Sequence, residues 1–388
     1  MWRNIASNAL TLFVVVLIAV GGVIAWGQNQ FSAPGPLAQP MCVKVDRGAT
    51  IGKLSEQLAA LQAISSPYVF RIGADYTDKA GGLKFGSYLV PAAASMEQIL
   101  GLVTGGGQST CGVEINYRIG VVTSALVLSE LDPATNALVE VAKFDPGTEE
   151  APAEYVAVQG EPDVRLRVTL AEGVTSWQVV QALKAWDVLS GDVKAVPAEG
   201  TLAPFSYDVV AGDGREALLS QMTTLQSQIL ADLWAGRAAD LPIKTPEEAL
   251  ILASIIEKET GVAQERERVA SIFVNRLREG MRLQTDPTVI YGITNGEAVL
   301  GRGLRQSELR RETPYNTYVI VGLPPTPIAN PGRASIEAAL HPEESDYLYF
   351  VADGTGGHAF ARTLTEHNEN VAKWRAIEAE RAAEPAAP

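Results

Sequence analysis

Two glutamates, Glu257 and Glu259, stand near the end of a strongly apolar segment of the chain. A carboxylate among Ile and Leu side chains costs free energy unless it has a partner or a chemical role. Thr245 followed by Pro246 predicts a helix over 246–260, because threonine caps helix N-termini and proline favours the first helical position. On this helix Glu259 shares a face with apolar side chains, whereas Glu257 lies closer to the polar edge. We therefore expect burial to raise the pKa of Glu259, as suits a group that gives and retakes a proton.

The same two acids are also compatible with a purely structural helix end. Negative charge near a helix C-terminus is mildly unfavourable with the helix dipole, so such an end would need other compensation. This segment alone leaves both interpretations open.

Uncharged polar and aromatic side chains are concentrated in the segments that follow. Sugars are bound by such hydrogen-bonding groups together with aromatic ring faces. The candidate glycan-binding residues are Gln284, Thr285, Asp286, Thr288, Tyr291, Tyr315, Asn316, Asn330 and His358. For Asp286, which precedes Pro287, we favour a helix N-cap on local grounds. His358 stands in a glycine-rich turn, where it is equally compatible with facing the cleft and with tying the turn.

Length and charge restrict the class of protein. The 388 residues are enough for two or three domains, and 45 acidic side chains outnumber 31 basic ones. Binding of nucleic acid needs clustered Lys and Arg to neutralise phosphates, so we expect no nucleic-acid partner.

The N-terminal segment Ile5 to Trp26 contains no charged residue. It is long enough to span a bilayer, which takes roughly 20 residues. A cleaved signal peptide is the alternative, but its apolar region is normally shorter and ends in a small-residue site that is absent here. Arg3 precedes the segment and no Lys or Arg follows it until Lys44, which predicts a cytoplasmic N-terminus and a chain that lies outside the inner membrane beyond residue 27.

The two cysteines, Cys42 and Cys111, both follow this segment. In an exported chain an even number of cysteines favours a disulfide, and two free buried thiols are the alternative.

The order of patterns along the chain predicts an α+β fold with several parts. Two segments share a strand, a capped helix and a second strand, which indicates two related small α/β modules. The expected parts are a cytoplasmic start and membrane anchor (1–27), a linker (28–41), a first module (42–111), a β-rich insertion (112–167), a second module (168–220), a mainly helical domain with small strands (221–374) and a disordered tail (375–388).

Several chemistries lack their motifs. The three histidines form no His-Glu-x-x-His helix, and we expect no metal and no cofactor. No Ser-x-x-Lys or Gly-x-Ser-x-Gly sequence occurs, which argues against serine acylases and serine hydrolases of the elbow type.

Several of these motifs together resemble the endolytic murein transglycosylases, the YceG-like family. The resemblance covers about residues 166 to 374 and the N-terminal anchor. Its motifs are Ala253-Ser-Ile-Ile-Glu-Lys-Glu-Thr260, Arg276-Leu-Arg278, Gly280-Met-Arg-Leu-Gln-Thr-Asp-Pro-Thr-Val-Ile-Tyr291, Tyr315-Asn-Thr-Tyr318, Gly322-Leu-Pro-Pro325 and Tyr349-Phe-Val-Ala-Asp-Gly354. The chain departs from the family in reading Pro204-Phe-Ser-Tyr207 where Pro-Asp-Thr-Tyr is usual, and in its β insertion and cysteine pair.

The resemblance implies cleavage of peptidoglycan strands between N-acetylmuramic acid and N-acetylglucosamine, which leaves a 1,6-anhydro end. It matches the catalytic acid to Glu259 and makes the first module LysM-like. It further implies a single-pass protein of the bacterial inner membrane, with its catalytic domain in the periplasm, that limits nascent glycan length and has peptidoglycan synthases as candidate partners. A non-catalytic, peptidoglycan-binding scaffold of the division or elongation machinery is the alternative.

Overall fold

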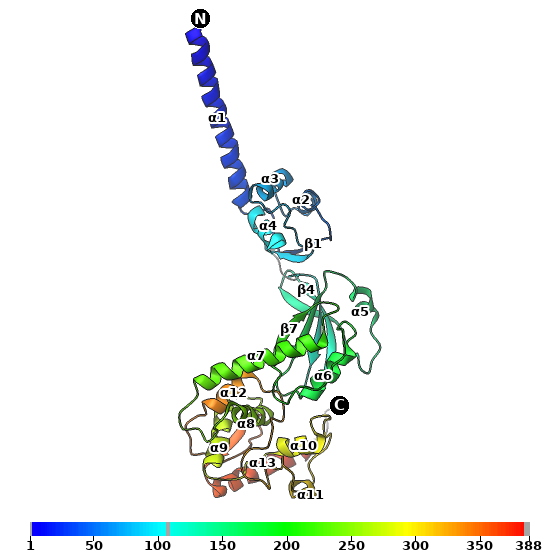
Figure 1. Ribbon diagram of the computed structural model, residues 1–388, viewed down its shortest axis with the longest axis vertical. Coiled ribbons are helices and arrows are strands. Elements are labelled where there is room, and N and C mark those ends of the chain that lie inside the picture. The colour runs from blue at the N-terminus through cyan, green and yellow to red at the C-terminus, as the bar shows by residue number, and fades with distance from the viewer. Residues whose placement is uncertain (1, 106–108, 384–388) are drawn as a thin grey trace. The chain divides into compact units, whose positions relative to one another are not determined.

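The computed structural model describes residues 2–105 and 109–383 (Figure 1). They form two compact units. The first comprises Met1–Asn116, Val127–Phe144 and Glu150–Leu166, and the second comprises Tyr117–Leu126, Asp145–Glu149 and Arg167–Pro388, each within the described residues. The fold is α+β, as the sequence predicts, with an apolar N-terminal helix and a five-stranded sheet.

The N-terminal helix α1 (Trp2–Ser32) contains a stretch, Ala9–Ser32, that is long and apolar enough to cross a membrane. An 18-residue segment within it has a mean hydropathy of 2.6, and a membrane anchor and a signal sequence both fit it. The predicted linker over 28–41 is partly wrong, because α1 continues through Ser32. Residues 28–32 contain no proline or glycine that would end a helix, and Phe31 packs against the core of the module that follows.

That first module alternates strands and helices around a small core. Its elements are β1 (Met41–Val45), α2 (Ile51–Ala60), α3 (Pro67–Tyr76), β2 (Gly86–Val90) and α4 (Met96–Thr104). The two strands pair antiparallel, and Val43 lies opposite Tyr88. Thr50, Ser66 and Ser95 accept hydrogen bonds from backbone N–H groups in the first turns of the three helices, which satisfies donors that a helix N-terminus leaves free.

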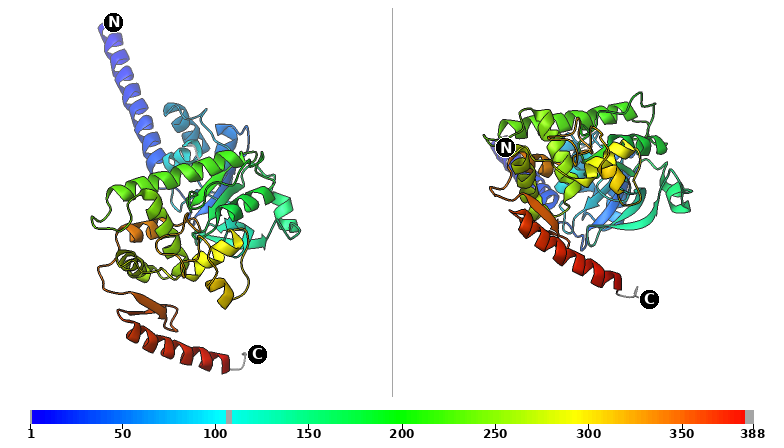
Figure 2. Two further views of the ribbon diagram at one scale, coloured as in Figure 1. Left: turned by 60° about the horizontal axis from the view of Figure 1, so that its bottom comes forward. Right: turned by 90° about the horizontal axis from the view of Figure 1, so that it is seen from below.

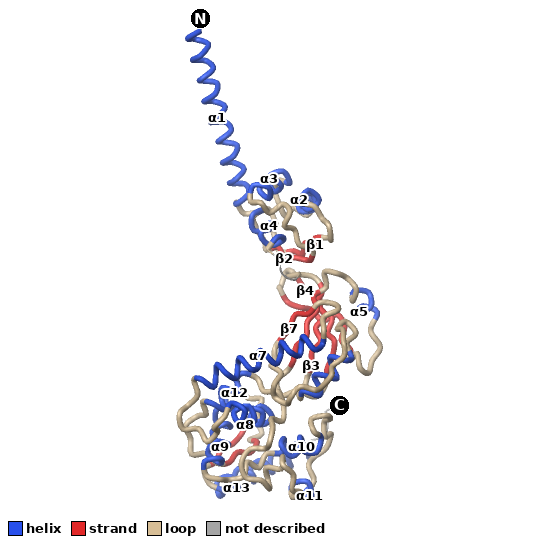
Figure 3. Tube along the Cα trace, viewed as in Figure 1, coloured by secondary structure: helices blue, strands red, loops and turns tan. Residues whose placement is uncertain are grey.

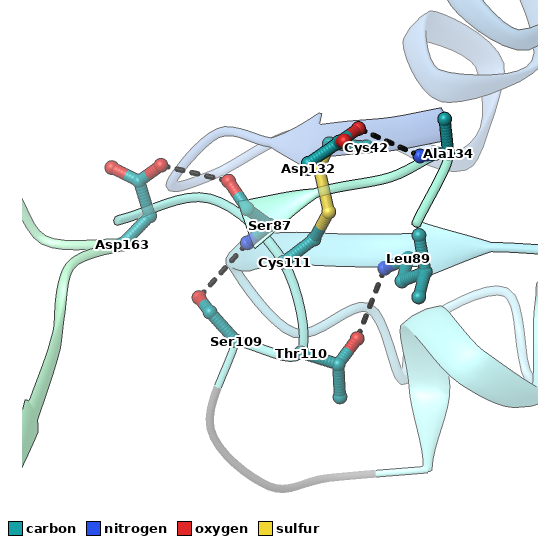
Figure 4. The surroundings of a disulfide bond; sticks show 9 residues. All are labelled: Cys42, Ser87, Leu89, Ser109, Thr110, Cys111, Asp132, Ala134 and Asp163. Atoms are coloured by element: carbon teal, nitrogen blue, oxygen red, sulfur yellow. Dashed lines mark hydrogen bonds between the residues drawn. A yellow bond between two sulfur atoms is a disulfide. The ribbon is translucent and has the colours of Figure 1, made fainter. Parts of the chain in front are cut away.

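A disulfide joins Cys42 on β1 to Cys111, with the two Cα atoms 5.6 Å apart (Figure 4). Residues 109–111 lie along β2. The Ser109 hydroxyl accepts a hydrogen bond from Ser87 N at 2.9 Å, and the Thr110 hydroxyl accepts one from Leu89 N at 3.0 Å. The bridge closes a loop of 69 residues, and in the chain-entropy model such a crosslink stabilises the fold by about 4 kcal/mol.

The five-stranded sheet, whose strands are red in Figure 3, has the strand order β5-β4-β3-β6-β7. Its strands are β3 (Val113–Ile119), β4 (Ser124–Asp132), β5 (Ala137–Phe144), β6 (Arg165–Leu170) and β7 (Ser206–Val209), with the helices α5 (Ala153–Val158) and α6 (Ser176–Ala185) between them in sequence. The β-rich insertion predicted over 112–167 and the module predicted over 168–220 thus supply strands to one sheet. The expected boundary at 167 falls inside β6, because the pairing of β3 with β6 has no local signal in the sequence.

Helices dominate the rest of the chain. They are α7 (Arg215–Ala235), α8 (Pro246–Glu259), the 3₁₀ turn η1 (Ala263–Glu265), α9 (Arg266–Arg278), α10 (Asp286–Thr294), α11 (Gln306–Leu309), α12 (Arg333–Leu340) and α13 (Leu364–Ala383). Helix α8 packs against α7, α9 and α12 and contributes more residues to the buried core than any other helix. The antiparallel hairpin of β8 (Tyr349–Ala352) and β9 (His358–Ala361) lies beside α13 (Figure 2).

The disordered tail predicted over 375–388 is wrong in its first part. Helix α13 continues to Ala383, because the residues from Ile377 to Ala383 are mostly Ala, Glu and Arg, which favour helix. Residues 384–388 lie outside the described residues.

Candidate active site

Helix α8 places Glu259 at its last position, and its bounds agree with the sequence prediction to within one residue. The Thr245 hydroxyl accepts a hydrogen bond from Glu248 N at 3.2 Å, and Pro246 opens the first turn. Every residue from Ala249 to Ile256 is buried, so packing fixes the helix on most of its circumference. The carboxylate at its end is therefore carried on a rigid element.

The carboxyl group of Glu259 is partly buried and accepts a hydrogen bond at Oε1 from the hydroxyl of Thr285. Burial raises the pKa of this carboxyl, and the negative charge of Asp286 raises it further. The hydrogen bond from Thr285 and the positive charges of His358 and Arg276 act in the opposite direction, but the pKa remains above its ordinary value. Such a group can hold a proton closer to neutral pH than an exposed glutamate.

The donor Thr285 is itself held by two other buried threonines. Its backbone N donates to the hydroxyl of Thr317 at 3.0 Å, and its carbonyl oxygen accepts from the hydroxyl of Thr288 at 2.9 Å. The hydroxyls of Thr288 and Thr317 lie 2.9 Å apart. This cluster leaves Thr285 little freedom to turn away from Glu259.

Asp286 is the first residue of α10, and Thr285, not Asp286, occupies the N-cap position. The N-cap prediction for Asp286 is therefore displaced by one residue. The exposed Asp286 carboxylate accepts a hydrogen bond from the Tyr318 hydroxyl at 2.7 Å. Gln284 precedes these residues with a positive φ of 49° and an exposed side chain, and its backbone N donates to Thr317 O at 3.1 Å.

Arg276 is a charged residue near Glu259 that the sequence analysis did not include among the site residues. Its side chain on α9 is buried and donates to two carbonyl oxygens, from Nη1 to Leu283 at 2.6 Å and from Nε to Leu348 at 2.7 Å. Burial lowers its pKa, and its charge favours the ionised form of Glu259. The sequence could have indicated Arg276, because it is an arginine among apolar residues on a helix that faces the core.

Tyr291 and Tyr315 form an aromatic pair with ring centroids 5.1 Å apart. The Tyr291 hydroxyl donates to the partly buried carboxylate of Glu199 at 3.2 Å, and the Tyr315 and Thr326 hydroxyls lie 2.8 Å apart. Tyr291 also lines a cavity of about 360 Å³ beside Lys258, the residue that precedes Glu259. Burial raises the pKa of Glu199 and lowers that of Lys258.

Asn316 and Asn330 are fully enclosed, and their side chains bind backbone groups of this chain. Asn316 Nδ2 donates to the carbonyl oxygens of three residues from 308 to 311, the shortest at 2.7 Å to Arg311. Asn330 Nδ2 donates to Val174 O and its Oδ1 accepts from Leu202 N, both at 2.9 Å. The structure thus gives both side chains a role in holding loops.

His358 ties its glycine turn to a second acidic residue. Its Nδ1 lies 2.8 Å from Glu265 Oε2, and its backbone N donates to Glu265 Oε1 at 3.0 Å. A positive charge on this ring would favour the ionised form of Glu259. Among the described residues, no group of three or more His, Cys, Asp or Glu side chains is placed to hold a metal ion.

Comparison with known proteins places most of this chain in one family. The model of the YceG-like family matches residues 120–373, which include Glu259 and every candidate residue from Gln284 to His358. The endolytic murein transglycosylase of Bacillus subtilis is 37% identical over 194 residues, which are 48% of this chain and 51% of that protein. The enzyme of that name from Streptococcus pneumoniae D39 is 32% identical over 182 residues, which are 45% of this chain and 32% of that protein.

The chain thus spans about half, or less, of the length of these relatives. A crystal structure of a YceG-like protein from Listeria monocytogenes is 27% identical and covers 86% of this chain and 99% of its own, with a TM-score of 0.46. With the family model matched along residues 120–373, the chain belongs to the YceG-like family.

Proposed function

We propose that this protein is a lytic transglycosylase that cleaves the bond between N-acetylmuramic acid and N-acetylglucosamine within peptidoglycan strands and so limits nascent glycan length. The observation that carries the proposal is Glu259, a partly buried carboxyl of raised pKa fixed at the end of α8 and hydrogen-bonded by Thr285. The names of the matched relatives support the reaction class, and the matched segment contains this residue.

One carboxyl group is sufficient for this reaction. Protonated Glu259 donates its proton to the departing glycosidic oxygen while positive charge develops at the anomeric carbon. The ionised carboxylate then accepts the proton of the muramyl C6 hydroxyl, which attacks the same carbon and closes the 1,6-anhydro ring. Because the nucleophile belongs to the substrate, its effective concentration is high and no water needs to be activated. Two-acid hydrolases, in contrast, need a second carboxylate to activate water or to attack the sugar.

The neighbouring residues fall into two groups in this proposal. Gln284, Asp286, Tyr291 and Tyr315 contact the glycan, since their side chains retain exposed surface. Thr285 influences the protonation of the acid through its hydrogen bond. The buried residues Thr288, Asn316 and Asn330 hold the neighbouring loops in place through the hydrogen bonds described above. His358 stabilises the glycine turn next to the site.

The N-terminal part of the chain supports the proposal of a membrane-anchored protein that faces the cell wall. We propose that α1 anchors it in the inner membrane with the remainder in the periplasm, and the apolar stretch Ala9–Ser32 supports this placement. The strand–helix–helix–strand order of residues 41–90, with its two strands antiparallel, supports a LysM-like module over 42–111. Peptidoglycan strands are the proposed substrate, and peptidoglycan synthases are proposed partners.

The test uses purified sacculi and the full chain with Glu259→Gln. The amide keeps the acceptor for Thr285 but supplies no proton, so strand cleavage should fall by about 10²- to 10⁴-fold. Glu257→Gln is the matched control: it changes the other acid of α8, whose Oε2 accepts from Gly332 N at 3.0 Å, and should retain activity. Mass spectrometry of the released fragments identifies anhydro ends.

Other outcomes would contradict the proposal in distinct ways. Reducing ends without anhydro products would indicate a hydrolase. Retention on sacculi without any product would indicate the non-catalytic scaffold. Full activity of Glu259→Gln would remove Glu259 from the mechanism.

A further inference from the structure

Helix α3 of the first module carries an exposed apolar stripe. Phe70 and Ala74 point into the module core and are fully buried. Tyr68, Ile72 and Tyr76 follow one another at intervals of four residues, so they share the outer face, and they are 71%, 67% and 81% exposed. Single exposed apolar side chains are ordinary, but a contiguous row on one helix face marks a surface that contacts something apolar.

The stripe continues the apolar surface of α1. Helix α1 packs against α3 and α4 (Figure 1), and a cavity of about 590 Å³ is lined by Val23 and Trp26 of α1 together with Ile72 and Tyr76 of α3. The stripe therefore lies beside the part of α1 where the apolar sequence gives way to the polar residues 28–30. On a membrane-spanning helix, this transition marks the level of the bilayer interface.

We propose that the stripe of Tyr68, Ile72 and Tyr76 lies in the interfacial layer of the same bilayer that α1 enters, with lipid as its occupant. The inference rests on the membrane anchor of the proposed function and is independent of the transglycosylase chemistry. It assigns α3 a second role, that of an interfacial helix that fixes the face of the first module toward the membrane.

The chemistry of the stripe fits lipid. Tyr and Trp are enriched where a bilayer meets water, because their rings are apolar and their polar atoms reach the headgroups. The guanidinium of Arg71 lies over the Tyr68 ring, 4.7 Å from its centroid, which places a cation at the edge of the stripe where lipid phosphates would stand. Continuity with α1 favours lipid over a soluble partner, because any occupant of this face must lie beside the membrane-entering helix.

The test places a fluorescent bimane label on the full-length protein in nanodiscs, at Ile72→Cys and separately at Tyr76→Cys. The native Cys42 and Cys111 are joined in the disulfide and do not compete for the label. Leu138→Cys is the matched control, since Leu138 is also apolar and 40% exposed but lies on β5 of the same compact unit. Each preparation is compared in plain lipid and in lipid that carries a nitroxide quencher at the headgroup.

We expect the labels at 72 and 76 to lose most of their fluorescence in quencher lipid and the label at 138 to change little. Equal quenching at all three positions would overturn the proposal. Labels at 72 and 76 that are shielded from water but not quenched would also overturn it, because they would indicate contact with a second copy of the protein. Failure of the protein to insert into nanodiscs would remove the anchor and this inference with it, whereas activity on sacculi would report separately on the transglycosylase.

Discussion

The hydroxyl group of Thr285 donates a hydrogen bond to Oε1 of Glu259, across 26 residues of sequence and from the start of one helix to the end of another. This bond favours the ionised carboxylate and partly offsets the effect of burial, which raises the pKa of Glu259. The protonation of the proposed catalytic acid is therefore set by a neutral neighbour as well as by its apolar surroundings.

Thr285→Val removes this donor with little change in shape. Without the hydrogen bond the ionised form loses stabilisation, so the pKa of Glu259 should rise further. The protonated acid then persists to higher pH, and the alkaline limb of the rate profile for strand cleavage should move upward. Thr285→Ser keeps the hydroxyl and should leave the limb in place; an upward movement in both variants would show that packing, not the hydrogen bond, controls the acid.

Asp286→Asn should move the same limb in the opposite direction. The negative charge of Asp286 raises the pKa of Glu259, so its removal should lower that pKa and shift the alkaline limb downward. The amide oxygen can still accept the hydrogen bond from Tyr318. Because Asp286 is exposed, the shift should shrink in high salt. The products should keep their anhydro ends, and a complete loss of turnover would instead make Asp286 a second catalytic acid.

Glu259→Gln should stabilise the fold in a pH-dependent manner. Burial raises the folded-state pKa of Glu259 above its unfolded value of about 4.3, so ionisation opposes folding. Below both pKa values Glu259 is protonated in the folded and the unfolded chain, so it costs the wild-type protein no stability. The loss of stability begins as pH rises through the pKa of the unfolded state and is complete above the pKa of the folded state. Urea unfolding followed by tryptophan fluorescence, from pH 4 to pH 8, should show a gain for Glu259→Gln that grows with pH. Glu247→Gln, on the exposed start of the same helix, should give a nearly constant difference.

Local signals in the sequence predicted helix α8 well. The Thr245 cap, Pro246 and the apolar run act within a few residues of one another, so α8 begins and ends close to where they indicate. The contacts that give individual side chains their roles join residues that lie far apart in the sequence. Glu265 binds His358 from 93 residues away, and Asn330 binds Val174 from 156 residues away. Residue type and spacing do not identify such partners. The pairing of β3 with β6 was not predicted for the same reason.

Asn330→Ala tests whether this asparagine acts on the glycan or on the fold. Its side chain joins Val174 O and Leu202 N in a fully buried position. Truncation leaves Leu202 N without this partner, whereas Val174 O keeps the hydrogen bond from the backbone N of residue 330. A buried group that loses its hydrogen bond destabilises a protein by about 1–3 kcal/mol, so we expect a loss of that size in the free energy of unfolding. The folded fraction should retain the wild-type KM for glycan strands. A raised KM with unchanged stability would contradict the structural role and return Asn330 to the glycan-binding residues.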